Sequence, residues 1–224
     1  TIVEATERLL PGLPAVVVTP VVRRLAELGV EVVTGATVVS DDGSAVTISK
    51  EDTTRAIECD VVAVVAGRVP NTDDLGLDVL GVAVDQRGLL PVGDDLLVAP
   101  RVAAIGDITP GPALAHRASA QAHVAAHVLS GHHERFAPLA VPAVVFSDPE
   151  IATTGFTIEE AQSAGLAAAT AVFPLAASGR ARTLGQPVGS VTVVHTADGV
   201  VVGAQLVGPH VSELVGEVTM AIER

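Results

Sequence analysis

Two stretches decide the fold of this chain, residues 60–72 (DVVAVVAGRVPNT) and residues 101–116 (RVAAIGDITPGPALAH). The first opens with an apolar, mostly β-branched run, residues 61–65. Such a run predicts a strand that is buried on both faces, as in a parallel sheet. Gly67 ends the run, at a point where an approaching ligand would leave no room for a side chain.

The second stretch contains another strand-like run, residues 102–105, followed at its carboxyl end by Gly106 and Asp107. In open α/β sheets, ligands bind just outside the carboxyl ends of strands. A carboxylate at that place accepts hydrogen bonds from hydroxyl-rich ligands and repels phosphate. The loop 109–112 then leads to a helix expected from about Ala113, whose first N–H groups suit an anion or a polarised ring edge.

The first four residues, TIVE, predict the end of a strand with an acid, Glu4, at its tip. In a dinucleotide-binding unit a glycine-rich turn comes first, and an acid roughly 20 residues later binds the ribose 2′-hydroxyl. No G-x-G-x-x-G sequence occurs in this chain. On the residues alone, Glu4 is either a solvated acid at a strand end or the second half of such a unit.

Five motifs in order resemble the pyridine nucleotide-disulfide oxidoreductases, and within them the dihydrolipoamide dehydrogenase branch. They are GRVPNT (67–72), AIGDI with LAH (104–108 and 114–116), SDPEIATTGFTIEEA (147–161), FPLAASGRA (173–181) and GAQLVGPHVSEL (203–214). Together they span nearly the whole chain. The resemblance implies an α/β plus α+β fold, in which partial FAD- and NAD(P)-binding Rossmann-like domains precede an α+β dimerisation (interface) domain.

The same resemblance divides the chain into three parts. Residues 1–69 correspond to part of the NAD-binding domain, residues 70–138 to the C-terminal part of the FAD-binding domain, and residues 139–224 to a truncated interface domain. Two subunits meet at that domain in the family, so the resemblance implies a homodimer. A plain α+β domain with no special partner is the alternative for the last part.

For NAD, the resemblance implies three contacts. Glu4 would accept the ribose hydroxyl, the backbone at Val38 would pass near the adenine, and Gly67 would lie against the cofactor. The chain would then begin inside a nucleotide-binding domain, after its phosphate-binding turn.

For FAD, the resemblance implies that Asp107, next to Gly106, binds the ribityl chain of the flavin, and that the backbone of Ala115 meets the flavin ring. The alternative for Asp107 is a turn residue that caps the next helix.

The family's reaction needs a nicotinamide cofactor, a flavin, a redox-active disulfide, and a histidine that moves a proton to and from the thiol. The only cysteine, Cys59, lies between Glu58 and Asp60 and has no second cysteine with which to form that disulfide. No His-Pro-Thr motif is present. We therefore expect no catalytic residue in this segment, an inert isolated chain, and a purified chain that is colourless because both glycine-rich turns are missing.

Three functions stay open on the sequence. The chain is a segment of an FAD- and NAD-dependent dihydrolipoamide dehydrogenase, a segment of a related mercuric, quinone or low-molecular-weight thiol reductase, or itself a non-catalytic dimerisation module. The first implies, by resemblance, that the lipoyl-bearing acyltransferase subunit of 2-oxoacid dehydrogenase complexes is a partner.

The composition limits the kinds of partner and the cellular compartment that we expect for this chain. A net charge of −13 argues against nucleic acid and acidic membranes, because neutralising phosphate needs clustered Lys and Arg. No apolar run approaches the roughly 20 residues that span a bilayer. With one cysteine no internal disulfide can form, so we expect a reducing compartment and a cytoplasmic protein.

Local patterns predict the remaining elements. Thr19 is expected to cap a helix over residues 20–28 that starts at Pro20 and ends at Gly29. A strand over 30–39, a turn at 41–43 and strands over 45–49 and 55–58 should form a meander. The helix from Ala113 to about residue 130 carries three histidines on one face, but no acid or cysteine stands at ligand spacing beside them, so we predict no metal.

The last third should be a sheet with helices inserted. Strands are predicted over 141–146, 168–174, 190–195 and 200–206, with a turn at 197–199. Thr157 and Glu160 form a capping box, and Ser212 is expected to cap a final helix that buries Leu214, Val215, Val218 and Ile222.

Overall fold

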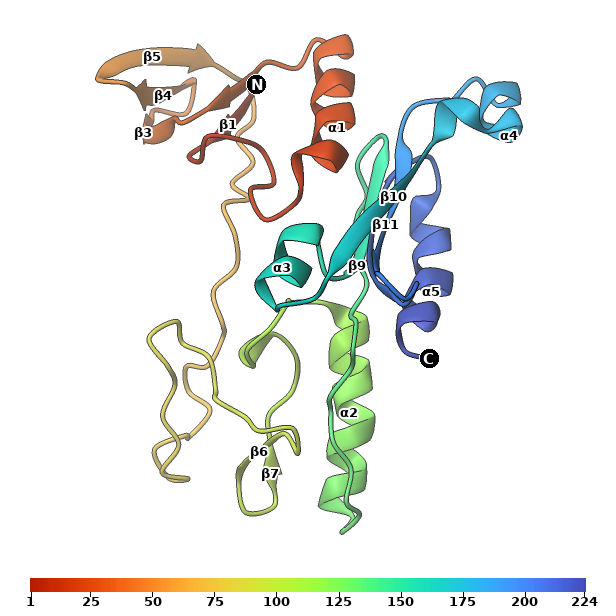
Figure 1. Cartoon of the computed structure of the whole chain (residues 1–224). Helices are drawn as coiled ribbons and strands as arrows, with labels where there is room; N and C mark the ends of the chain where they lie inside the picture. Colours follow the sequence, from red (N-terminus) through yellow and green to blue (C-terminus); the bar gives the residue numbers. More distant parts are fainter. The chain divides into compact units, whose positions relative to one another are not determined.

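A computed structural model describes all residues, 1–224, and divides them into two compact units (Figure 1). One unit contains residues 1–63 together with residues 139–224, and the other contains residues 64–138. None of the helices combines the length and the apolar character that crossing a membrane requires. The mixed α/β architecture predicted from the sequence is confirmed.

The N-terminal segment forms a small parallel β-α-β arrangement. Strand β1 (Ile2–Glu4) pairs in parallel with β2 (Val32–Thr34), and helix α1 (Ala15–Glu27) connects them. The strand predicted at the first residues is confirmed, with Glu4 at its carboxyl end. Gly29 ends α1 with a φ of +75°, a conformation that glycine adopts without a Cβ penalty.

The predicted start of α1 was wrong, because the helix begins at Ala15 and Pro20 lies inside it. Thr19 is not a cap: its Oγ1 donates to the carbonyl of Ala15 at 2.8 Å. Val17 and Val18 are buried together with Val21. Burying these three valines offsets the loss of the backbone hydrogen bond that Pro20, which has no N–H, cannot donate within α1.

A three-stranded antiparallel meander follows, formed by β3 (Thr37–Asp41), β4 (Ala45–Lys50) and β5 (Thr53–Glu58). The predicted hairpin turn is confirmed. The single strand expected over 30–39 is instead broken at Gly35, whose φ is +63°, so β2 and β3 belong to different sheets.

The C-terminal segment folds around a five-stranded sheet with strand order β10-β11-β12-β9-β8 (Figure 1). Its elements are β8 (Ala143–Val145), β9 (Glu150–Gly155), α3 (Ile158–Ser163), β10 (Ala168–Pro174), η2 (Leu175–Ala177), α4 (Gly179–Thr183), β11 (Ser190–Thr196), β12 (Val201–Gly208) and α5 (Val211–Ile222). The predicted strands and the capping box of α3 are confirmed, while β9 was not predicted.

Strands β9 and β12 carry the core, because their side chains alternate between two covered faces. Ile151 and Val207 pair across the strands and pack against the valines of α1. The neighbouring pair, Ala152 and Leu206, points the other way and packs against α5. The strand period of two explains this division.

Helix α5 is capped differently from the prediction. Its N-cap is His210, with a left-handed φ of 56°, and Ser212 lies inside the helix. The backbone N–H of Ser212 donates to a carboxylate oxygen of Glu150 on β9 at 3.1 Å. A residue distant in the sequence thus satisfies a free N–H of the first turn, which local patterns could not reveal. Leu214, predicted to be buried, is exposed, whereas Val215 and Ile222 are buried.

The unit of residues 64–138 contains a short antiparallel pair, β6 (Leu97–Ala99) and β7 (Val102–Ala103), then the 3₁₀ turn η1 (Gly106–Ile108) and helix α2 (Ala115–Leu129). Its core consists of Leu96, Val124 and Ala125. The helix predicted from about Ala113 is confirmed within two residues.

The strand predicted over residues 61–65 was wrong. These residues form neither strand nor helix, and Val64 and Val65 are 85% and 89% exposed. A strand that is apolar on both faces needs a neighbouring strand on each side and a layer above and below it. The sheets of this structure provide neither to residues 61–65.

Gly203 tests the packing of β9 against β12. A Cβ at Gly203 would lie 1.9 Å from the carbonyl oxygen of Phe156. We expect Gly203→Ala to lower the free energy of unfolding by about 3 kcal/mol, since backbone cannot yield as a side chain can. Urea unfolding followed by far-UV circular dichroism measures this. The control is Gly179→Ala, where a Cβ would meet no atom within 4 Å. Equal stability of the two variants would contradict the packing described here.

Candidate functional site

The predicted site residues fall into two groups, one in each unit. Glu4 and Val38 lie in the first unit, where Val3 of β1 packs on the core of the meander, formed by Ala36, Val46 and Ile48. Val38 lies at a register irregularity between β3 and β4, and its side chain is exposed. The backbone there departs from regular strand pairing.

Glu4 ends β1 at the carboxyl rim of the parallel pair β1-β2. Its Oε1 accepts hydrogen bonds from the backbone N–H of Thr6 at 2.7 Å and from the Thr6 hydroxyl at 2.8 Å. These bonds, led by that of the backbone N–H, lower the pKa of Glu4 below its ordinary value. The carboxylate is therefore ionised at neutral pH and held in a defined place.

Gly67, Gly106, Asp107 and Ala115 lie in the second unit. Asp107 is in η1, directly after Gly106, and its Oδ2 lies 3.2 Å from Nη1 of Arg68. The same nitrogen donates to the carbonyl of Ala113 at 3.2 Å. Arg68 thus connects the GRVPNT segment with the loop that runs from Asp107 to α2.

A cleft of about 530 Å³ opens beside Asp107. It is lined by Arg68, Val69, Pro70, Arg87, Leu89, Asp107, Gly111 and Ala113. Helix α2 begins just after this lining, at Ala115, and its N-cap, Leu114, makes no side-chain cap bond. The cleft therefore combines a carboxylate with two guanidinium groups, and its wall at Ala113 lies two residues before the start of α2.

Gly67 has a φ of +113°, and a Cβ placed there would meet no atom within 4 Å. The conformation favours glycine, but no protein atom crowds the position. The sequence predicts that an approaching ligand leaves no room for a side chain at Gly67. The protein itself leaves that space open.

The loop that carries Asp107 is held from behind by buried polar side chains. Gln121 is 1% exposed, and its Oε1 accepts the N–H of Gly106 at 2.7 Å. Arg117 is 7% exposed and donates to the carbonyl of Pro110. Burial lowers the pKa of the Arg117 guanidinium below its ordinary value, and the charge of Asp107 opposes this shift. Arginine nevertheless stays protonated in proteins.

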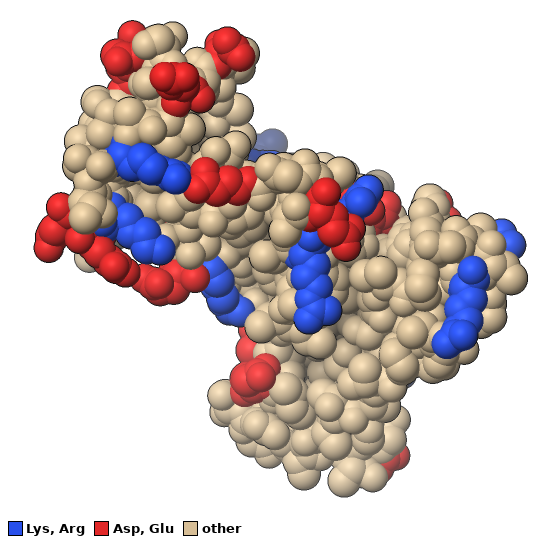
Figure 2. Space-filling model, turned by 90° about the horizontal axis from the view of Figure 1, so that it is seen from above, with Lys and Arg blue, Asp and Glu red and all other residues tan.

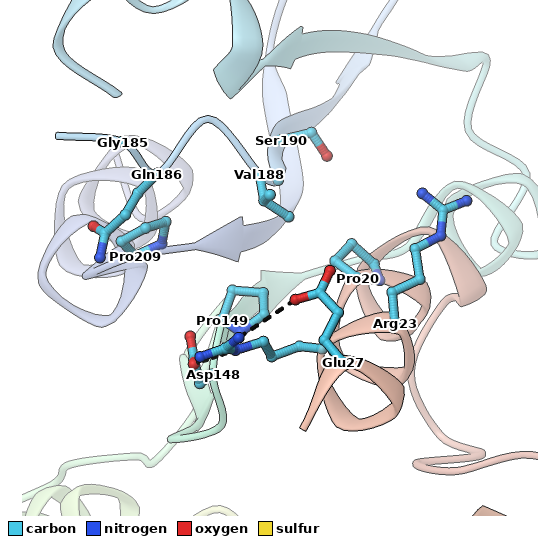
Figure 3. Close-up of a pocket in the computed structure, with 12 residues that line it drawn as sticks. Pro20, Arg23, Glu27, Asp148, Pro149, Gly185, Gln186, Val188, Ser190 and Pro209 are labelled. Carbon is cyan, nitrogen blue, oxygen red and sulfur yellow. Dashed lines mark hydrogen bonds and ion pairs between the residues drawn. The ribbon is translucent and has the colours of Figure 1, made fainter. Parts of the chain in front are cut away.

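A larger cleft, of about 690 Å³, lies in the first unit (Figure 3). Arg24 on its wall bonds Asp148 at 2.8 Å and Glu27 at 3.4 Å, so its charge is neutralised. Figure 3 shows Arg23 pointing away from Asp148. None of the cofactor-binding residues predicted from the sequence lines this cleft. We assign the candidate site to the smaller cleft because it contains Asp107.

Helix α2 carries the three histidines singled out in the sequence, His116, His123 and His127. No group of three or more His, Cys, Asp or Glu side chains is placed to hold a metal ion. His127 instead pairs through Nδ1 with Glu134, and its ring lies 5.9 Å from that of His132. Cys59 is a free thiol. On the face seen in Figure 2, Lys and Arg side chains stand apart from one another and form no continuous basic patch.

Sequence reasoning missed Arg68, Arg117 and Gln121. A signal existed for two of them: Arg117 and Gln121 stand four residues apart in an Ala-rich helix, so they share a face. Nothing local indicates that Arg68 faces Asp107, which is 39 positions away.

Comparison with family models identifies two matches that together cover most of the chain. Residues 1–122 match "Pyridine nucleotide-disulphide oxidoreductase", and residues 141–224 match "Pyridine nucleotide-disulphide oxidoreductase, dimerisation domain".

Similar curated proteins are named dihydrolipoyl dehydrogenase. That of Geobacillus stearothermophilus is 42% identical over 229 residues, covering 100% of this chain and 49% of that protein. That of Halobacterium salinarum is 41% identical over 230 residues, covering 100% of this chain and 48% of the relative. The chain thus spans about half the length of the curated relatives it matches.

Solved structures with this fold include LpdA from Mycobacterium tuberculosis, with a TM-score of 0.88 and 28% identity, covering 99% of this chain and 49% of that one. The HOCl-induced flavoprotein disulfide reductase RclA from Escherichia coli has a TM-score of 0.85 and 26% identity, covering 99% of this chain and 52% of that one.

Thr6 tests the environment of Glu4. Because the folded-state pKa of Glu4 is lowered, its ionisation stabilises the fold above the unfolded-state pKa, and this contribution is lost as pH falls through the folded pKa. Thr6→Val removes the hydroxyl donor and keeps the backbone donor. We expect the pKa of Glu4 to rise part of the way to its ordinary value, measured by carbon-detected NMR titration. Thr53→Val, which removes a hydroxyl bonded to Lys50, is the control. An unchanged pKa of Glu4 in Thr6→Val would contradict this geometry.

Proposed function

Because this chain belongs to the pyridine nucleotide-disulphide oxidoreductase family, we propose that it is a central-to-C-terminal segment of a dihydrolipoyl dehydrogenase that uses FAD and NAD. The observation that carries the proposal is similarity along the whole chain, at 37–42% identity, to proteins of that name. The full-length protein would oxidise protein-bound dihydrolipoamide with NAD⁺. The segment supplies cofactor contacts and a subunit interface, and we assign it no catalytic residue.

The residues around Asp107 fit a flavin nucleotide. The Asp107 carboxylate lies at the cleft with its oxygens accessible, as an acceptor for ribityl hydroxyls must. The uncapped start of α2 at Ala115 offers backbone N–H groups to an electron-rich ring edge. When bound, the flavin supplies the two-electron chemistry between thiol and nicotinamide. The part of this chain is to orient the flavin through Gly106, Asp107 and Ala115.

Glu4 fits the role of ribose acid for NAD. It stands at the carboxyl end of β1, ionised and fixed by Thr6, where it can accept a 2′-hydroxyl and would repel a 2′-phosphate. The exposed residue Val38 and the uncrowded Gly67 are the other two contacts proposed for NAD.

We propose the division into residues 1–69, 70–138 and 139–224 as partial NAD-binding, partial FAD-binding and interface domains. The match of residues 141–224 to a dimerisation domain supports a homodimer. The lipoyl-bearing acyltransferase subunit of a 2-oxoacid dehydrogenase complex is the further partner. The free thiol of Cys59 agrees with a reducing cytoplasm.

The exposed apolar residues between Val61 and Val69 support a longer protein. The side chains of Val61, Val64, Val65 and Val69 are all at least 84% exposed. An exposed contiguous apolar patch usually marks a surface that something else covers. We propose that in the full-length protein this run is covered by residues outside the 224 described here.

A related flavoprotein disulfide reductase is the second candidate, favoured by the structural similarity to RclA. Residues outside this segment separate the two. Both candidates need a redox-active cysteine pair before the segment, so the pair does not separate them, whereas a His-Pro-Thr motif after the segment would support the dehydrogenase. Absence of the His-Pro-Thr motif would favour the alternative.

Reversing the charge at Glu4 tests the cofactor assignment. In the full-length protein we expect Glu4→Arg to lower kcat/KM for NADH about tenfold or more and to raise it for NADPH, because guanidinium attracts the 2′-phosphate that a carboxylate repels. Steady-state rates with both cofactors measure this. Glu159→Arg, an equal charge reversal on α3, is the control and should leave the preference unchanged. Equal use of NADH and NADPH by the unmodified protein would contradict the role of Glu4.

A further inference from the structure

We propose that Gln121, Arg117 and Thr109 form a latch that positions Asp107 for the flavin. The inference rests on the proposed function, since it concerns how the same site is held. None of the three lines the cleft. Gln121 and Arg117 lie on α2 behind the loop of residues 106–110, Thr109 is part of that loop, and hydrogen bonds join them. They are positioning residues.

The first end of the loop is fixed by Gln121. Gly106 is buried and has a φ of +74°, and its N–H donates to Oε1 of Gln121 at 2.7 Å. A buried N–H without an acceptor is costly, so this bond determines where Gly106 can sit. A Cβ at Gly106 would lie 3.3 Å from Ala118, which shows how closely the loop approaches α2.

The second end is fixed by Arg117 and Thr109. The Arg117 guanidinium donates to the carbonyl of Pro110 and lies 3.3 Å from Oγ1 of Thr109. The Thr109 hydroxyl, also buried, donates back to the carbonyl of Gly106 at 2.8 Å. Arg117 itself lies over the ring of Phe136, 5.8 Å from its centroid. The Arg117 guanidinium therefore holds Thr109 and Pro110 directly, and the Thr109 hydroxyl connects them to Gly106 at the other end of the loop.

Asp107 lies between these two fixed ends and has few restraints of its own. Its side chain is 51% exposed, and its one ion pair is with Arg68, which is 73% exposed. Exposed ion pairs hold a side chain weakly. The point from which the Asp107 side chain projects into the cleft is therefore set by the backbone of Gly106 and Ile108. The latch holds that backbone in place.

The test uses the full-length protein and two substitutions at one position. Gln121→Met removes the acceptor of the Gly106 N–H at similar volume, whereas Gln121→Glu keeps an acceptor oxygen. The measurements are the FAD dissociation constant, from flavin fluorescence, and the visible circular dichroism of bound flavin. We expect Gln121→Met to weaken FAD binding about tenfold and to alter the dichroism, with Gln121→Glu close to the unmodified protein. Gln162→Met, at an exposed position of α3, is the control.

Three outcomes decide the matter when Asp107→Asn is measured alongside. If Gln121→Met lowers the melting temperature but leaves FAD affinity and dichroism unchanged while Asp107→Asn weakens binding, the latch is only structural and the proposal fails. If neither variant affects FAD, Asp107 is not a flavin ligand, and the flavin assignment fails together with the latch. If Gln121→Met and Asp107→Asn both weaken FAD binding while Gln121→Glu binds FAD like the unmodified protein, the latch is supported.

A second variant covers the case in which Gln121→Met does not fold. Arg117→Lys keeps the charge but loses the fork that joins Thr109 to Pro110. The latch predicts several-fold weaker FAD binding with altered dichroism, and unchanged values for both would overturn it.

Discussion

Apolar side chains need cover, and this constraint accounts for which parts of the chain are well formed. Strands β9 and β12 are covered on one face by α1 and on the other by α5, so Ile151 and Leu206 are both buried although they point in opposite directions. Residues 61–65 have the composition of an interior strand but find no such cover, and they stay exposed. Burial of apolar side chains therefore accounts for both outcomes: β9 and β12 form strands because their faces are covered, and residues 61–65 form none because theirs are not.

Polar burial adds a second level of order around the candidate site. Helix α2 could have been held by apolar contacts alone, such as those of Val124 and Ala125. It also buries Arg117 and Gln121, and each finds partners on the loop after β7. Buried polar groups cost free energy unless they are hydrogen-bonded, so their complete pairing restricts the loop to one arrangement. Asp107 is exposed at the end of that arrangement, where a ligand can reach it.

The sequence predicted what depends on local chemistry and on motifs in order. The Asp42 turn, the Thr157 capping box and the strands of the C-terminal sheet follow from neighbours in the chain. What it did not predict depends on distant partners. The Glu150 carboxylate is the acceptor for an N–H of α5. Helix α1 begins at Ala15 and not at the predicted Pro20, which lets Val17 and Val18 join the core. Arg68 reaches Asp107 across 39 positions. Motifs suggested both groups of predicted site residues, but they did not indicate the side chains that hold the loop of one group.

The central claim is that this chain is one part of a larger flavoprotein, whose remaining residues cover what is exposed here. Hydrogen–deuterium exchange of residues 61–69, compared between the 224-residue chain and the full-length protein, tests it most directly. The account predicts fast exchange of these amides in the chain alone and strong protection in the full-length protein. Fast exchange in both would mean that nothing covers the run, and would contradict the account.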